Sequence, residues 1–65
     1  MAALLHYKDM SGKDAYINIR DVIQITPSQR YHGYDIRYRV DTGRNATSGN
    51  IWGCKITQEE LNKFL

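Results

Sequence analysis

The 65-residue chain contains a single cysteine, Cys54. A lone cysteine can neither form a disulfide within the chain nor supply a cysteine-rich metal site. A domain of this size buries only about 60% of the surface that its unfolded chain exposes, so its stability is marginal without further support. We therefore expect stability to come from a well-packed sheet or from self-association as a homodimer.

The sequence also lacks a long hydrophobic run. Its apolar start, Met1 to Leu5, is interrupted by His6, Lys8 and Asp9 before it reaches the length of a signal-peptide core or a membrane span. We therefore expect a cytoplasmic protein that does not bind membranes. The lone cysteine agrees with a reducing compartment.

Neither sign of charge dominates the composition. Nine basic and seven acidic side chains leave a net charge of +2, far from the balance of a dedicated nucleic-acid binder. Hydrophobic residues make up 42% and charged residues 25% of the chain, which are ordinary values for a folded domain. No repeat or linker interrupts the sequence, so we interpret residues 1–65 as a single domain.

A set of catalytic or metal-binding residues is missing as well. The two histidines, His6 and His32, lie in different segments, and neither forms a recognisable motif with Cys54, a serine or an acid. Trp52, Cys54 and Ile56 are spaced by two and so share one face of the predicted last strand, and we predict that Cys54 is a buried small hydrophobe there. No three or four metal ligands converge in the sequence. We expect a protein that is not an enzyme and that binds neither metal nor cofactor.

The strongest structural pattern covers residues 34–41. Apolar and charged side chains alternate there, with Tyr34, Ile36, Tyr38 and Val40 on one side and Asp35, Arg37, Arg39 and Asp41 on the other. This spacing of two is typical of a half-buried β-strand. Because every second residue is aromatic or β-branched, we predict that this strand lies at the centre of a small antiparallel sheet with one face in water.

Four further segments have strand patterns: residues 4–10, 15–20, 22–26 and 51–56. A bend at residues 18–21 is favoured over one long strand with a bulge, since the alternation stops there. Pro27 ends the third segment because proline lacks the amide that a ladder needs. Residues 45–50 are all polar or small and predict the most mobile loop, with residues 27–33 as the second candidate.

The end of the chain predicts a short helix. Thr57 and Glu60 form a capping box, in which the threonine hydroxyl binds the Glu60 amide and the glutamate reaches back to the Thr57 amide. Leu61, Phe64 and Leu65 form an apolar stripe on a helix of about two turns, which must dock to be stable. The predicted fold is α+β: a small curled antiparallel sheet of four to five strands, partly open and barrel-like, with one short C-terminal α-helix.

Two function classes remain open. Five tyrosines and one tryptophan are interleaved with five arginines, and these residue types are enriched at the centres of protein interfaces. The leading hypothesis is a protein-interaction module that acts as a regulator, inhibitor or adaptor of a larger partner. The alternative is a small β-domain that binds single-stranded DNA or RNA by stacking bases on aromatic side chains beside basic groups.

The charge pattern of the central strand favours the protein-interaction hypothesis. Asp35 and Asp41 share the predicted water-facing side with Arg37 and Arg39, which suits cross-strand ion pairs better than phosphate binding. An open edge strand can also pair with a second copy or with a partner's strand. Trp52 fits either the core or an interface. The predicted partner-binding residues are Tyr16, Arg30, Tyr31, Arg37, Arg39, Arg44 and Trp52.

Overall fold

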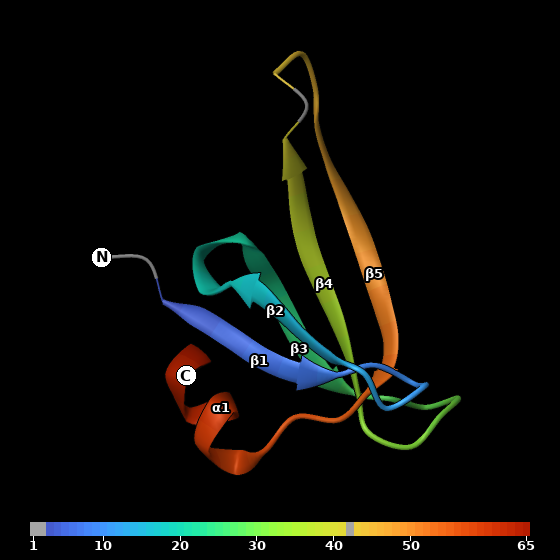
Figure 1. Cartoon of the computed structure of the whole chain (residues 1–65). Helices are drawn as coiled ribbons and strands as arrows, with labels where there is room; N and C mark the ends of the chain where they lie inside the picture. Colours follow the sequence, from blue (N-terminus) through green and yellow to red (C-terminus); the bar gives the residue numbers. More distant parts are fainter. Residues whose placement is uncertain (1–2, 42) are drawn as a thin grey trace.

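The structure is a computed structural model that describes residues 3–41 and 43–65. Its described residues form five strands, one 3₁₀ turn and one α-helix (Figure 1). In chain order these are β1 (Leu4–Lys8), β2 (Asp14–Asn18), η1 (Ile19–Asp21), β3 (Val22–Pro27), β4 (Tyr34–Asp41), β5 (Ala46–Cys54) and α1 (Gln58–Phe64).

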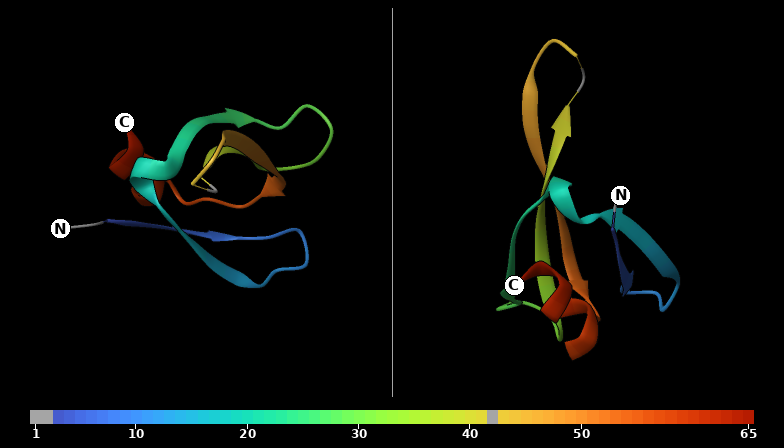
Figure 2. Two further views of the ribbon diagram at one scale, coloured as in Figure 1. Left: turned by 90° about the horizontal axis from the view of Figure 1, so that it is seen from above. Right: turned by 90° about the vertical axis from the view of Figure 1, so that its left-hand side faces the viewer.

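The strands belong to two antiparallel sheets. One contains β1 and β2, and the other has the order β3-β4-β5. Among the described residues one bridge joins them, just beyond β5: the Lys8 N–H donates to the Lys55 carbonyl at 2.9 Å, and the Lys55 N–H donates to the Lys8 carbonyl at 2.8 Å. The two views of Figure 2 show the β1–β2 hairpin standing apart from the larger sheet. The α+β class is confirmed, but the single curled, barrel-like sheet is not.

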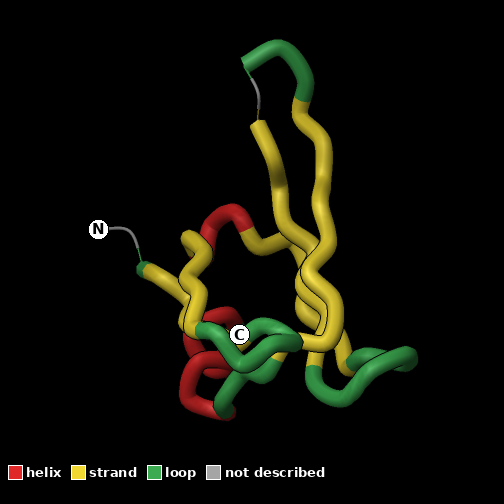
Figure 3. Tube along the Cα trace, turned by 45° about the vertical axis from the view of Figure 1, so that its right-hand side comes forward, coloured by secondary structure: helices red, strands yellow, loops and turns green. Residues whose placement is uncertain are grey.

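The η1 turn explains why the strands divide. The Asn18 side chain accepts a hydrogen bond from the Arg20 N–H at 3.2 Å and caps the turn that begins at Ile19. The predicted bend at residues 18–21 is therefore confirmed. Figure 3 shows η1 leading from one group of strands to the other. Because the chain turns there, β2 and β3 do not pair and the sheet cannot continue from one to the other.

The expectation of a loop at residues 45–50 is wrong for residues 46–50. These residues belong to β5, where Asn50 lies opposite Arg37 and Ala46 lies opposite Asp41. The β4 strand offers backbone amides and carbonyls along its length. The hydrogen bonds that a neighbouring strand makes with them do not require apolar side chains on that strand. The last strand thus covers Ala46–Cys54 in place of residues 51–56. Its polar half lies in a β4–β5 hairpin that projects from the rest of the fold (Figure 1).

The core is small and draws on both sheets. The buried hydrophobic residues of the described chain are Leu5, Val22, Ile36 and Cys54. Half-buried side chains surround them, namely Tyr7, Ile17, Ile19, Ile25, Tyr34, Ile51, Ile56 and Phe64. The prediction that Cys54 is a buried small hydrophobe is confirmed. With so few fully buried side chains, hydrogen bonds that fix one element against another carry much of the tertiary specificity.

The helix α1 begins as expected but docks in an unexpected way. The Thr57 hydroxyl oxygen accepts the Glu60 N–H at 3.3 Å, which confirms the predicted cap. The prediction that Glu60 reaches back to the Thr57 amide is wrong, because the Glu60 carboxylate accepts the His6 N–H of β1 at 2.7 Å. Its other oxygen lies 2.7 Å from Lys63 Nζ. Glu60 therefore ties the helix to the first strand.

We expect this tie to depend on pH. The hydrogen bond from Lys63, followed by that from the His6 N–H, holds the pKa of Glu60 below its ordinary value of 4.5. Because the pKa is lower in the folded state, the ionised carboxylate stabilises the fold fully at a pH above the ordinary pKa. This stabilisation is lost as the pH falls through the folded-state pKa. Glu60→Gln should lower the thermal unfolding midpoint at neutral pH and have little effect in strong acid.

The matched control is Glu59→Gln, since Glu59 lies in the same helical turn but is exposed. This substitution removes the same charge near the helix N-terminus without removing the contact to β1. It should lower the midpoint less than Glu60→Gln does at neutral pH. A difference between wild type and Glu60→Gln that stays constant down to strong acid would contradict the assignment.

Candidate functional site

The outer face of the three-stranded sheet is the face turned away from the core. On β4, Arg37 and Arg39 are exposed on this face and Ile36 is buried on the other, so the predicted alternation is confirmed. Arg37 lies between Gln24 of β3 and Asn50 of β5. The outer face is thus mainly polar along the middle of the sheet.

A bulge at Gly53 changes which way the end of β5 faces. Tyr34 pairs with Cys54 but Ile36 pairs with Ile51, so Trp52 and Gly53 together lie opposite Asp35. Gly53 has a φ of +64°, a left-handed conformation that favours glycine. The Asp35 carboxylate accepts the Gly53 N–H at 3.0 Å and holds the bulge in place.

The bulge places Trp52 and Cys54 on opposite sides. Trp52 lies on the outer face and is 48% exposed, whereas Cys54 is fully buried. The expectation that Trp52 shares a face with Cys54 and Ile56 is therefore wrong for Trp52, because the extra residue inverts the alternation after it, whereas Cys54 and Ile56 both contact the core. The question of whether Trp52 belongs to the core is answered: it is a surface residue. The feature of the sequence that indicates this bulge is Gly53, a glycine inside a strand pattern.

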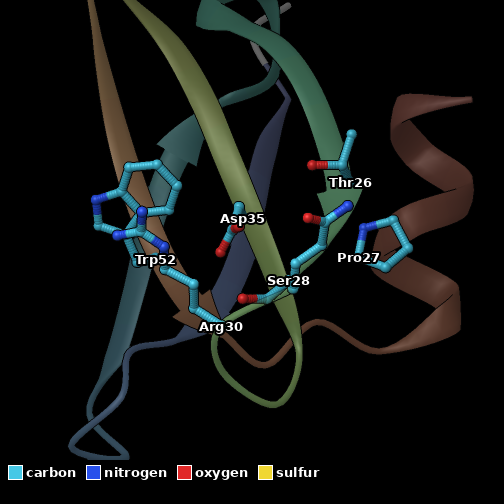
Figure 4. Close-up of a pocket in the computed structure, with 7 residues that line it drawn as sticks. Thr26, Pro27, Ser28, Arg30, Asp35 and Trp52 are labelled. Carbon is cyan, nitrogen blue, oxygen red and sulfur yellow. The ribbon is translucent and has the colours of Figure 1, made fainter.

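Trp52 lines an open cleft of about 630 Å³ together with the end of β3 and the loop that follows it. Figure 4 shows the cleft, whose lining residues are Thr26, Pro27, Ser28, Gln29, Arg30, Asp35 and Trp52. Arg30 and Trp52 therefore share one depression, with the Asp35 carboxylate between β3 and β5. The cleft combines an aromatic surface, a guanidinium group and hydrogen-bonding side chains.

The β3–β4 loop is fixed in position by its own hydrogen bonds. The Ser28 N–H donates to the Gly33 carbonyl at 2.9 Å, and the Ser28 hydroxyl oxygen accepts the Tyr31 N–H at 3.0 Å. Gly33 has a φ of +98°, and a Cβ there would collide with the Cys54 carbonyl oxygen. The loop therefore packs tightly against the end of β5, which brings Arg30 and Tyr31 beside the bulge.

Met10 and Tyr31 extend this site on the far side of Gly53. A Cβ added to Gly53 would lie 2.8 Å from Tyr31 Cβ and 2.9 Å from Met10 Sδ, so both side chains pack over the glycine. Met10 is 60% exposed and Tyr31 is 46% exposed. We call Met10, Arg30, Tyr31 and Trp52 the Trp52 surface. It gathers three large, partly exposed hydrophobic side chains around one arginine.

The structure brings together three of the seven predicted partner-binding residues, Arg30, Tyr31 and Trp52. Arg37 lies on the same outer face, farther along β4, and makes no ion pair with the described residues. Arg39 lies 3.8 Å from Asp21, which offsets its charge. Met10 was not predicted as a partner-binding residue, because in the sequence it is only the last residue of the first strand pattern.

Tyr16 and Arg44 lie away from the Trp52 surface. Tyr16 is on β2, where its ring stacks on that of His6 with centroids 5.0 Å apart. The His6 ring also lies 2.9 Å from the Asp14 carboxylate. Arg44 follows Gly43 at the tip of the β4–β5 hairpin, where the Asp41 carboxylate accepts the Gly43 N–H at 2.9 Å.

No family model, no curated protein and no solved structure matches this chain. Within residues 3–41 and 43–65, no three His, Cys, Asp or Glu side chains gather in a way that could hold a metal ion. No helix in this described part has the length and apolar composition needed to cross a membrane.

The position of Cys54 makes the bulge testable by chemistry. Burial raises the pKa of the Cys54 thiol to about 11, and Sγ lies 3.2 Å from the Tyr34 carbonyl oxygen to which it donates. The reactive thiolate is therefore scarce near neutral pH, and reagents cannot reach it. We expect iodoacetamide to modify Cys54 very slowly in the native protein and readily in denaturant. Equal rates in the two states would contradict the inward orientation of Cys54.

Proposed function

We propose that this chain is a protein-binding module that acts as a regulator, inhibitor or adaptor of a larger partner, and that the Trp52 surface is its contact site. The observation that carries this proposal is the half-exposed indole of Trp52, held outward by the Gly53 bulge. Tryptophan, tyrosine and arginine are the residue types that dominate binding energy in protein interfaces. Three of the four residues of this surface are of these types.

The chemistry of the surface suggests how a partner is bound. The partner would cover Trp52 and Tyr31, whose rings offer large apolar area at low cost in conformational entropy. Met10 is flexible and adapts to the shape of the partner. Arg30 makes no ion pair with the described residues, so its guanidinium is available for a carboxylate or carbonyl oxygen at the rim of the contact.

We propose a binding role without catalysis, carried out in the cytoplasm. His6 is engaged with Asp14 and the Tyr16 ring on the β1–β2 hairpin, whereas His32 is an exposed residue of the β3–β4 loop. The buried Cys54 has a raised pKa and is a poor nucleophile. The cytoplasmic assignment is supported by the lone cysteine, which agrees with a reducing compartment.

Single-stranded nucleic acid is the second candidate ligand. The observation that favours it is the shared cleft of Arg30 and Trp52, where a base could stack on the indole while the guanidinium contacts a phosphate. The Asp35 carboxylate lies in the same cleft and repels phosphate. We therefore rank this candidate below a protein partner.

The test compares the wild type with Trp52→Ala in affinity capture from cells that express the protein. We expect Trp52→Ala to weaken partner binding by about 30-fold, equivalent to about 2 kcal/mol. Tyr16→Ala is the matched control because Tyr16 is also an exposed aromatic residue, 63% exposed, but lies on the other sheet. Equal capture of a partner by the wild type and both variants would contradict the assignment of the surface.

The same proteins should be tested with labelled mixed-sequence oligonucleotides at low and high salt. Binding that weakens steeply with salt and is lost in Arg30→Ala would favour the nucleic-acid candidate. Fluorescence anisotropy of the labelled oligonucleotide is the suitable readout, because it does not depend on Trp52. Under the proposed function, no salt-sensitive binding is expected.

A further inference from the structure

The outer edge of β5 is open along most of the strand. β5 pairs with β4 on one side, and on its other side no strand of residues 3–41 and 43–65 pairs with Ala46–Cys54. The bridge between Lys8 and Lys55 comes only after the strand has ended. In Figures 1 and 2 the distal part of the β4–β5 hairpin extends beyond the other elements. An open edge presents unpaired amides and carbonyls to any strand that approaches it.

This edge carries none of the features by which proteins block strand addition. Between Ala46 and Trp52 the sequence has no charged residue and no proline, and the bulge comes only at Gly53. The opposite edge of the sheet differs, because β3 has a register shift between Val22 and Gln24 and ends in Pro27. Lysines, prolines and bulges are the usual protection of sheet edges. Of the two edges of this sheet, β5 is therefore the one suited to pairing.

We propose that β5 pairs antiparallel with β5 of a second copy of this chain, in a register centred on Gly49. The two three-stranded sheets then form one sheet of six strands. In this register Asn50 faces Ser48 of the second copy, Ile51 faces Thr47, and Trp52 faces Ala46. The proposal concerns the edge of β5 and does not rest on the proposed function, although Trp52 belongs both to this register and to the Trp52 surface.

The sequence of β5 is complementary to itself in this register. On the outer face the large Trp52 ring lies over the small Ala46 of the other strand, and Asn50 and Ser48 form a polar pair. On the inner face the β-branched side chains of Ile51 and Thr47 meet, a pairing that stabilises sheets. Every large side chain thus faces a small or shape-compatible one.

The centre of the register also fits the space around Gly49. A Cβ on Gly49 would lie 2.6 Å from Tyr38 Cζ, so the Tyr38 ring covers this glycine on the inner face. Two glycines therefore meet at the symmetry axis with a tyrosine ring beside each. Since residue 49 has no side chain, nothing at the axis competes with the two tyrosine rings for space on the inner face.

The register also fixes how far the paired region extends. Residue 54 of one copy comes opposite residue 44 of the other, and the pairing ends there because Lys55, the next residue, already pairs with Lys8. The remaining elements of the two copies then lie at opposite ends of the paired strands. Because the core of one chain is small, the area buried between copies adds support that the single domain lacks.

The test is sedimentation equilibrium of the full chain over a wide concentration range. We expect the wild type to dimerise and the variant Ser48→Glu/Asn50→Glu to dimerise at least about 10-fold more weakly, because the proposed register sets glutamates opposite each other at two places. Within one chain the new glutamates face Arg39 and Arg37, so the hairpin itself is not destabilised. Circular dichroism and thermal unfolding verify that the variant is folded.

Gln24→Glu is the matched control. Gln24 and Asn50 flank Arg37 from opposite edges of the same sheet, so this substitution places the same charge beside the same arginine on the β3 edge. It should leave the dimer unchanged. A wild type that stays monomeric at the highest attainable concentration would overturn the proposal. So would a dimer that survives Ser48→Glu/Asn50→Glu or that is weakened equally by Gln24→Glu.

Discussion

The hydrogen bond between the Gly53 amide and the Asp35 carboxylate is the interaction on which the rest of the structure depends. It holds a bulge that inserts one extra residue into β5, and this residue decides which side chains enter the core. Cys54 turns inward and is fully buried, while Trp52 turns outward. The next residue, Lys55, is then placed to form the bridge to Lys8 that joins the two sheets. One local feature thus affects the core, the surface and the connection between sheets.

The small core makes such polar contacts important. Leu5, Ile36 and Cys54 are the largest fully buried side chains in the described part of the chain, and they come from three different strands. The helix has no fully buried residue of its own and is attached to β1 through the Glu60 carboxylate. A hydrogen bond to a charged group is stronger than one between neutral groups. In this fold, carboxylates at positions 35 and 60 therefore fix elements that apolar packing alone holds loosely.

Much of the architecture could be predicted from residue patterns. The alternation of residues 34–41, the bend at residues 18–21 and the Thr57 cap each depend on neighbours within a few residues, and all three are confirmed. The strand character of residues 46–50 could not be predicted in this way. It comes from pairing with β4, and such a tertiary contact overrides the weak local preference of polar residues.

The sequence predicted the types of residue in the candidate site better than it predicted which of them lie together. Arg30, Tyr31 and Trp52 were expected to bind a partner and do come together. Their meeting depends on the tight packing of Gly33 against Cys54, and the contribution of Met10 depends on the β1–β2 turn. The Glu60 contact to His6 joins residues 54 positions apart. Contacts of this range leave no periodic signal in a sequence.

The most direct measurement of the central claim is acrylamide quenching of the fluorescence of Trp52, the single tryptophan of the chain. It should be made on dilute native protein and again in denaturant. Because the bulge leaves the indole 48% exposed, we expect acrylamide to quench native Trp52 readily, at a substantial fraction of its efficiency on the unfolded chain. Strong protection of the native fluorescence would show that Trp52 lies in the core beside Cys54, and it would contradict the bulge and the surface built around it.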